Sequence, residues 1–206
     1  MRGEQRNLLF SRAMGLLAEG KIVIFDLEYT TWEGAMARNW SGEGEYCEIV
    51  QIGAVKLDRR NDFCEIATFN RLVRPRVNPQ LSDYFVNLTG VTQVEVDENG
   101  RPFPEVISDF HAFVGDDTSM VYSFGGDEKF VYLNCGLHKI SCPIGPRQFR
   151  DIMPIFQIAL DKGLEPLTTG QLPELVDFTP PGRAHDALAD VRCTAAALRI
   201  IKADRA

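Results

Sequence analysis

The stretch Lys21–Thr30, KIVIFDLEYT, carries the strongest structural signal in the chain. Its four consecutive apolar residues, Ile22 to Phe25, are typical of a strand that is buried on both faces. Asp26 and Glu28 follow directly, and because side chains alternate along a strand, both point to one face. Buried carboxylates are costly unless positive charge offsets them, so the pattern indicates a cation site. A solvated strand end is the simpler alternative.

The composition limits the class of protein. A chain of 206 residues fits one domain with a sizeable core, and 45% hydrophobic and 25% charged residues are ordinary for a soluble globular protein. No run is long enough to span a membrane. Five cysteines without a C-x-x-C pair argue against a disulfide framework and a zinc site, so we expect a cytoplasmic protein. A net charge of −7 disfavours non-specific binding of long nucleic acids, but not binding of a short end together with metal cations.

The domain organisation follows from apolar periodicity. We expect an N-terminal helix or extension over 1–20, ending at Gly20, and a single domain over 21–206. The helical face is indicated by Leu8, Leu9, Arg12, Leu16 and Leu17. Strands are predicted at 21–28, 48–57 and 64–73, and the last two form an antiparallel hairpin across the turn DRRND.

Helices and strands alternate in the rest of the chain. Helices are predicted around 81–90, 104–114, 127–140 and 186–204, a strand around 119–124, and a strand running into a helix at 148–156. A hairpin followed by alternating strands and helices predicts an α/β fold. We expect a mixed central sheet of about five strands that is flanked by helices.

Two further motifs carry polar residues that suit a metal site. In GRAHDALAD, His185 and Asp190 would lie about 140° apart on one helix, so they converge only if His185 lies in the preceding loop. The Pro-Pro-Gly approach favours that arrangement. In SFGGDEKF, Gly125 and Gly126 permit a sharp turn before Asp127. Taken alone, His185 is more simply a structural or exposed histidine, and Asp127 a helix cap.

Taken together, Asp26, Glu28, Asp127, His185 and Asp190 resemble the DEDDh group of 3′–5′ exonucleases, which is named for four acidic residues and a histidine. FDLE is similar to the first motif of the group and HDALAD to the third, whereas Gly126 stands where the second motif often has an aromatic residue. The stretches EIVQIGAV, LVRPRVNPQLSDYFVNLTGVTQ and FPEV are similar to the branch of the histone mRNA 3′-end exonuclease and related RNA-trimming enzymes. Animal members of this branch often carry an added nucleic-acid-binding domain, for which residues 1–20 are too short.

The resemblance implies an RNase H-like fold and two Mg²⁺ or Mn²⁺ ions, whose four positive charges match four carboxylates. It implies that Asp26 bridges both ions, that Glu28 and Asp190 bind one of them, and that Asp127 acts through water. It also implies that His185 is the general base and that the products are nucleoside 5′-monophosphates.

The resemblance further implies contacts to the terminal nucleotide. Leu27 would lie against it, and backbone groups from Glu28 to Thr30 would reach its 3′-hydroxyl. Leu88 would wedge against the terminal base, although a core leucine is an almost equal alternative, and Thr89 is a weaker candidate. The loop from Tyr29 to Cys47 also contains Trp32 and Trp40. These tryptophans are either stacking platforms for bases or anchors of the loop, and the second interpretation is slightly favoured.

These features predict a metal-dependent 3′–5′ exonuclease that hydrolyses single-stranded RNA or short oligonucleotides. We expect RNA or DNA 3′ ends as partners and no membrane. The alternatives are a DNA 3′–5′ exonuclease, a catalytically silent RNA-binding module on the same fold, and a protein-interaction domain. The natural substrate and the oligomeric state stay open.

Overall fold

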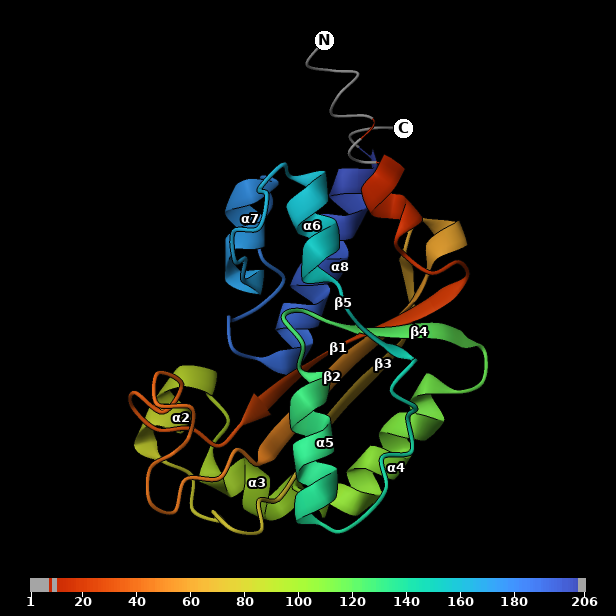
Figure 1. Ribbon diagram of the computed structural model, residues 1–206. Coiled ribbons are helices and arrows are strands. Elements are labelled where there is room, and N and C mark those ends of the chain that lie inside the picture. Colours follow the sequence, from red (N-terminus) through yellow and green to blue (C-terminus); the bar gives the residue numbers. More distant parts are fainter. Residues whose placement is uncertain (1–7, 9–10, 204–206) are drawn as a thin grey trace.

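A mixed five-stranded sheet forms the centre of the molecule in the computed structural model, which describes residue 8 and residues 11–203 (Figure 1). The strands are β1 (Lys21–Tyr29), β2 (Ile49–Asp58), β3 (Cys64–Leu72), β4 (Thr118–Ser123) and β5 (Phe149–Asp151). Their order across the sheet is β3-β2-β1-β4-β5. β1 and β3 run antiparallel to β2, whereas β4 is parallel to both β1 and β5. The predicted mixed sheet and the predicted hairpin are therefore confirmed.

Helices cover both faces of this sheet. They are α2 (Asp83–Thr89), α3 (Gln93–Asn99), α4 (Phe103–Val114), α5 (Glu128–Leu137), α6 (Met153–Ala159), α7 (Leu172–Leu175) and α8 (Ala187–Ala203), with the short 3₁₀ helices η1 (Arg59–Asn61) and η2 (Thr169–Gln171). Figure 1 shows α6, α7 and α8 on one side of the sheet and α4 and α5 on the other. No helix among the described residues is both long enough and apolar enough to cross a membrane.

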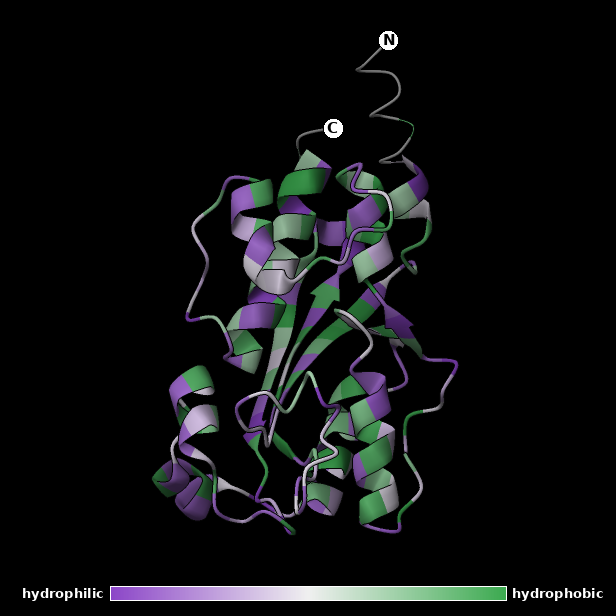
Figure 2. Ribbon diagram, turned by 60° about the vertical axis from the view of Figure 1, so that its left-hand side comes forward, coloured by the Kyte–Doolittle hydropathy of each residue, from purple (hydrophilic) through white to green (hydrophobic). Residues whose placement is uncertain are grey.

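The apolar run of β1 supplies both layers of the core. Ile22 and Ile24 pack into the cluster that contains the buried residues of α6 and α8, whereas Val23, Phe25 and Leu27 pack into the cluster of α4 and α5. Figure 2 shows the central strands largely in the hydrophobic colour. Burial on both faces explains why β1 has no alternation of apolar and polar residues before Asp26.

Most predicted elements match the structure in type and position. The ambiguous segment 148–156 becomes β5 followed by α6, as predicted. The helices α3 and α7 were not predicted. A signal for α3 was present, because Thr92 and Glu95 form a capping box at its start.

The N-terminal prediction needs a correction. Residues 11–15 are helical, but the helix does not reach Gly20, which instead has a φ of +82° in the turn before β1. The buried residues of this segment are Ala13 and Leu17, while Leu8 and Leu16 are exposed. Leu9 lies outside the described residues. Because Ala13 and Leu17 belong to the core cluster of α6 and α8, this segment covers part of the sheet.

Candidate active site

A cavity of about 500 Å³ opens at the C-terminal end of β1. Its lining includes seven of the nine residues predicted for the site, namely Asp26, Leu27, Glu28, Leu88, Asp127, His185 and Asp190. These residues come from β1, α2, the start of α5, and the loop and first turn of α8. Segments more than 150 residues apart in the sequence thus converge on one cavity.

Gly53 permits the close approach of α8 to the sheet. It lies on β2 directly opposite Asp26. A Cβ atom at this position would lie 2.4 Å from the backbone of Ala187 and Leu188, so any side chain would push α8 away. The amide of Ala187 also donates to Gln51 Oε1 on β2 at 3.3 Å. The glycine within EIVQIGAV thus has a structural role in bringing Asp190 to the carboxylates of β1.

His185 lies in the loop before α8, as the five-residue spacing required. Its φ is +61°, and its amide donates to Asp190 Oδ2 at 3.0 Å. Glu28, His185 and Asp190 each offer one ligand atom within 4.8 Å of the others, so these three could hold a metal ion. This group contains the histidine that the resemblance assigned as a base, and a test must therefore separate the two roles.

Asp127 does not act as a simple helix cap. It occupies the N-cap position of α5, but its side chain makes no capping hydrogen bond. Its amide instead donates to Ser123 Oγ at 3.0 Å, and Gly125 and Gly126 have φ values of +91° and +87°. Asp127 lies in the lining of the cavity, where its charge raises the pKa of Asp26.

Burial is the first cause of the raised pKa values of all four carboxylates, and the other carboxylates of the site add to it at Asp26 and Glu28. Burial, followed by the charge of Asp190, raises the pKa of Glu28 to about 8. Burial also raises the pKa of Asp127 to about 7, and the pKa of Asp26 lies well above its usual range through burial and the charge of Asp127. The pKa of Asp190 is raised in the same direction, again mainly by burial. Among the described residues that line the cavity there is no Lys or Arg.

A cavity with this charge distribution needs an external cation. Carboxylate oxygens are the preferred ligands of hard divalent cations such as Mg²⁺ and Mn²⁺. Binding of such a cation would reverse the pKa shifts, because it favours the ionised form of each carboxylate. The donor set therefore fits the predicted metals, although it does not distinguish Mg²⁺ from Mn²⁺.

The raised pKa values predict an unusual pH dependence of stability in EDTA. Glu28 and Asp127 bind protons more tightly in the folded state than in the unfolded state. Their stabilising contribution is therefore complete below about pH 4, the usual range of carboxyl groups, and is lost as the pH rises through about 7 to 8. We expect the free energy of unfolding, measured by urea titration, to fall over this window.

Glu28→Gln is the matched control for this prediction, because it removes the charge and keeps the shape. Its stability advantage over the wild type should be small at pH 4 and should grow towards pH 8. Saturating Mn²⁺ should remove the decline in the wild type. A pH-independent difference between the two proteins would contradict the charge-repulsion account.

Thr30 and Thr89 differ from the nucleotide-binding expectation. Neither is among the residues that line the cavity, and both are buried. The Thr30 hydroxyl donates to the carbonyl of Tyr46 and accepts from the amide of Glu48. The Thr89 hydroxyl donates to the carbonyl of Phe85 and accepts from the amide of Val91. The contact at Thr30 was predicted for its backbone, but its amide donates to the carbonyl of Glu48 and its carbonyl accepts from the indole of Trp40. Because these groups are engaged within the protein, we do not retain Thr30 and Thr89 as nucleotide contacts.

Leu27 and Leu88 do line the cavity. Leu27 is buried in the floor, where it also belongs to the core cluster of α4 and α5. Leu88 is only half-buried and belongs to none of the apolar clusters found among the described residues. This position favours the wedge interpretation of Leu88 over the core interpretation.

The two tryptophans of the loop between β1 and β2 have different surroundings. The indole of Trp40 donates to the carbonyl of Thr30 at 3.1 Å, and its ring packs edge-on against Tyr29 and Phe130. Trp40 is thus an anchor, in agreement with the slightly favoured interpretation. Both tryptophans line the cavity and are half-buried, but Trp32 makes none of the aromatic pairs found in the described chain.

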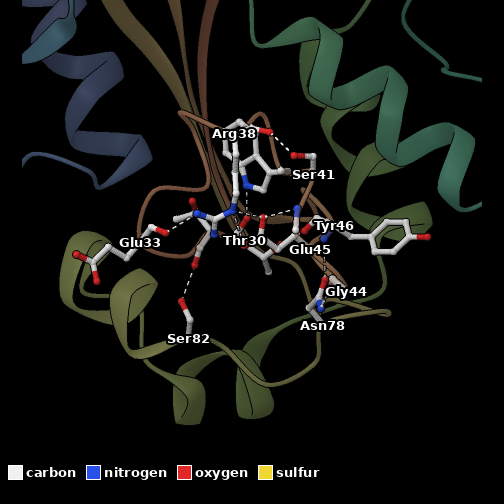
Figure 3. Close-up of polar contacts among 12 residues, drawn as sticks. Thr30, Glu33, Arg38, Ser41, Gly44, Glu45, Tyr46, Asn78 and Ser82 are labelled. Carbon is white, nitrogen blue, oxygen red and sulfur yellow. Dashed lines mark hydrogen bonds and ion pairs between the residues drawn. The ribbon is translucent and has the colours of Figure 1, made fainter.

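The loop is held by many polar contacts, which Figure 3 shows. Arg38 pairs with Glu45 inside the loop. From the segment before α2, the side chains of Ser82 and Asn78 donate hydrogen bonds to backbone carbonyls of the loop. At its end, the buried carboxylate of Glu48 accepts hydrogen bonds from three amides over residues 76–78. The wall of the cavity that carries Trp32 is therefore built before any substrate binds.

Several lining residues were not assigned from the sequence. Met36 from the loop, Tyr84 from α2 and Thr169 from η2 all lie in the lining, and Met36 and Tyr84 are largely exposed. Tyr84 lies in the quoted stretch LSDYFVNLTG, one helical turn before Leu88, so helical spacing could have found it. Met36 and Thr169 had no comparable signal.

Comparison with known proteins gives a consistent result. Residues 23–198 match the family described as Exonuclease, RNase_T. The chain is similar to human 3′-5′ exoribonuclease 1, with 33% identity over 131 residues, which cover 59% of this chain and 35% of that protein. It is also similar to the 3′-5′ exonuclease crn-4 of Caenorhabditis elegans, with 29% identity over 163 residues, covering 70% of this chain and 52% of that protein. The chain thus spans about a third to a half of these curated relatives.

The fold is likewise similar to a solved structure. The nuclease domain of 3′hExo, a DEDDh family member, bound to rAMP, superposes with a TM-score of 0.76 at 23% identity. The match covers 90% of this chain and 93% of that chain. At this level of identity the likeness concerns the fold, and it confirms the predicted RNase H-like α/β architecture.

Proposed function

The chain belongs to the Exonuclease family, and from this membership we propose that it is a metal-dependent 3′–5′ exonuclease. It releases nucleoside 5′-monophosphates from the 3′ ends of single-stranded RNA or short oligonucleotides. The observation that carries the proposal is the convergence of four carboxylates and His185 on one cavity whose described lining holds no Lys or Arg. Such a cavity favours the binding of divalent cations, and bound cations would in turn attract the phosphate group of a phosphodiester.

The shared cavity lining supports the metal-binding roles that the resemblance implies for the acidic residues. Asp26, Glu28, Asp127 and Asp190 would hold two Mg²⁺ or Mn²⁺ ions. When bound, these ions would offset the carboxylate charge, favour ionisation of the attacking water and stabilise the leaving 3′ oxygen. Asp190 has a second task, because it accepts the amide hydrogen of His185 and so fixes the backbone of that residue. His185 would take the proton from the attacking water.

The rest of the cavity suits one nucleotide. The acidic residues of β1 share the lining with Trp32 from the loop and with Tyr84 and Leu88 from α2. A nucleotide is itself amphipathic, with a charged phosphate and a flat base whose faces are apolar. We assign the phosphate to the acidic residues and the base to the space between Trp32 and Leu88, where an aromatic face supports stacking.

DNA is the second candidate substrate. The human relative is named an exoribonuclease, whereas the C. elegans relative is named an exonuclease without a stated sugar. We favour RNA, because a 2′-hydroxyl can donate to and accept from backbone groups beside the terminal sugar. A lost hydrogen bond of about 1–3 kcal/mol would give RNA roughly a tenfold higher kcat/KM than DNA of the same sequence at one salt concentration. Equal values would remove the preference for RNA and leave the exonuclease proposal standing.

The end of the RNA from which degradation starts gives the sharpest test of the proposed function. An RNA that carries a 3′-terminal phosphate should resist degradation, because the site accepts a free 3′-terminal nucleotide, whereas a blocked 5′ end should have no effect. The measurement is gel analysis of matched RNAs with either end blocked. Cleavage of a circular RNA would contradict the proposal and indicate an endonuclease.

A protein without catalytic activity would explain the site less well. A silent RNA-binding module or a protein-interaction domain has no use for carboxylates that raise one another's pKa values. Substrate-dependent binding of Mn²⁺ would separate an enzyme from both. A cytoplasmic location is part of the proposal and is supported by five cysteines that form no disulfide.

A further inference from the structure

The loop that carries His185 is tied to the rest of the protein from two sides. On the C-terminal side, the amide of His185 donates to Asp190, and Asp186 accepts the amide hydrogen of Ala189 at 2.8 Å, which fixes the start of α8. On the N-terminal side, the attachment is made by one residue, Arg183. Within the described chain, residues 179–184 make no other hydrogen bond.

Arg183 binds the C-terminal end of α2. Its Nη2 atom donates to the carbonyl of Asn87 at 2.7 Å and to the carbonyl of Leu88 at 3.3 Å. Carbonyls in the last turn of a helix have no partner within the helix, and a positive charge at that end is favourable. The guanidinium group thus binds the carbonyl of Leu88, a residue that lines the same cavity as His185.

Gly90 makes room for this contact. It follows α2 with a φ of +80°, and a Cβ atom at this position would lie 2.3 Å from Nη1 of Arg183. The guanidinium group therefore rests directly over the glycine that ends the helix. The left-handed conformation and the close approach both favour glycine, so α2 ends in a surface that fits an arginine.

We propose that Arg183 is a positioning residue that straps the loop of His185 to α2 and so fixes His185 relative to Leu88 within the lining of the cavity. The inference rests on the proposed function, in which His185 is the base and Leu88 contacts the terminal nucleotide. Arg183 acts through these two residues. It couples the position of the terminal nucleotide against α2 to the position of the general base, His185.

Arg192 provides a matched control. Both arginines line a second cavity of about 540 Å³ beside the first, so both could in principle attract nucleic acid. Arg192, however, pairs with Glu65 of β3 at 2.9 Å and makes no hydrogen bond to the loop of His185 among the described residues. Only Arg183 therefore has the strap geometry.

Kinetics of Arg183→Ala test the coupling. We expect kcat to fall by about 10- to 100-fold, as for other residues that orient a catalytic group, with KM within about twofold of the wild type. Arg183→Lys, which keeps a donor and the charge, should recover part of the rate, and Arg192→Ala should leave kcat unchanged. Gly90→Ala, which displaces the guanidinium group without deleting it, should resemble Arg183→Ala.

A double-mutant cycle with His185→Ala decides whether Arg183 acts through His185. In the His185→Ala background, Arg183→Ala should cost less than about threefold, because the group that it positions is already absent. An equal loss in both backgrounds, or a rise in KM with unchanged kcat, would overturn the strap and indicate direct binding of a substrate phosphate. If Arg183→Ala does not fold, Arg183→Gln carries the same comparison.

Amide hydrogen exchange without substrate separates this inference from the proposed function. In Arg183→Ala, the amide of His185, which is the hydrogen-bonded amide of segment 179–186 in the described chain, should exchange faster than in the wild type and in Arg192→Ala, while β1 stays protected. Unchanged exchange in this segment would overturn the strap. Faster exchange in a chain that hydrolyses no nucleic acid would uphold the strap and reject the exonuclease proposal instead.

Discussion

Asp26→Asn should abolish hydrolysis of RNA in Mg²⁺ while the protein keeps its fold. Asp26 lies in the acidic cavity on β1, and the substitution removes a ligand charge without removing core packing. We expect the rate to fall by about 10³-fold or more, because several kcal/mol of charge stabilisation are lost from the transition state. In EDTA the variant should unfold at a higher temperature than the wild type, because the carboxylates of Asp127 and Glu28 no longer repel that of Asp26. Single-turnover kinetics and thermal unfolding together test both expectations.

Asp117→Asn is the matched control for this substitution. Asp117 is an exposed carboxylate that pairs with Lys21 and Lys56, away from the cavity. Its loss should leave the rate unchanged. Asp190→Ala should also be inactive, but it additionally removes the acceptor of the His185 amide, so it does not isolate the loss of a metal ligand. Near-normal turnover of Asp26→Asn in Mg²⁺ would show that the metal assignment is wrong. Ca²⁺ should bind to the wild type without supporting turnover, because its coordination geometry is looser.

His185→Ala should lower kcat by roughly 10²- to 10⁴-fold, the usual contribution of a general base. The pH–rate profile should also change, because a general base works only in its deprotonated form. The chain has three histidines, so His111→Ala on the exposed face of α4 and His138→Ala serve as controls. Both controls should keep the wild-type profile.

Kinetics of His185→Ala also distinguish the role of a general base from that of a metal ligand. Glu28, His185 and Asp190 are close enough to share one cation, so loss of His185 could act by weakening metal binding. In that case, a high Mn²⁺ concentration should restore the rate of His185→Ala. The proposed base predicts instead that the rate stays low at saturating Mn²⁺. An unchanged pH profile in the variant would remove His185 from the role of base.

The parts of the fold that were predictable from sequence depend on local signals. The apolar run before Asp26 indicated a strand covered on both faces, and the core clusters show that β1 supplies both layers. The five-residue separation of His185 and Asp190 required a loop before the helix, and His185 has that position. In both cases, the spacing of residues along the sequence was sufficient to predict the local structure.

Other features depend on contacts between distant segments, and the sequence could not show them. Trp32 and Trp40 look alike in the sequence, but only Trp40 meets Phe130 and is anchored by it. The backbone of Thr30 was a candidate nucleotide contact, but its amide donates to the carbonyl of Glu48 and its carbonyl accepts from the indole of Trp40. The hydrogen bonds of Arg183 to α2 link residues about 95 positions apart in the sequence.

The central claim, metal-dependent release of single nucleotides from the 3′ end, is tested most directly with one RNA labelled at either end. In Mn²⁺, the 3′-labelled RNA should release its label at once as a nucleoside 5′-monophosphate, while the 5′-labelled RNA should shorten one nucleotide at a time. Neither RNA should change in EDTA. Release of the label from the 5′ end first, labelled fragments from internal cleavage, or equal activity in EDTA would contradict the account.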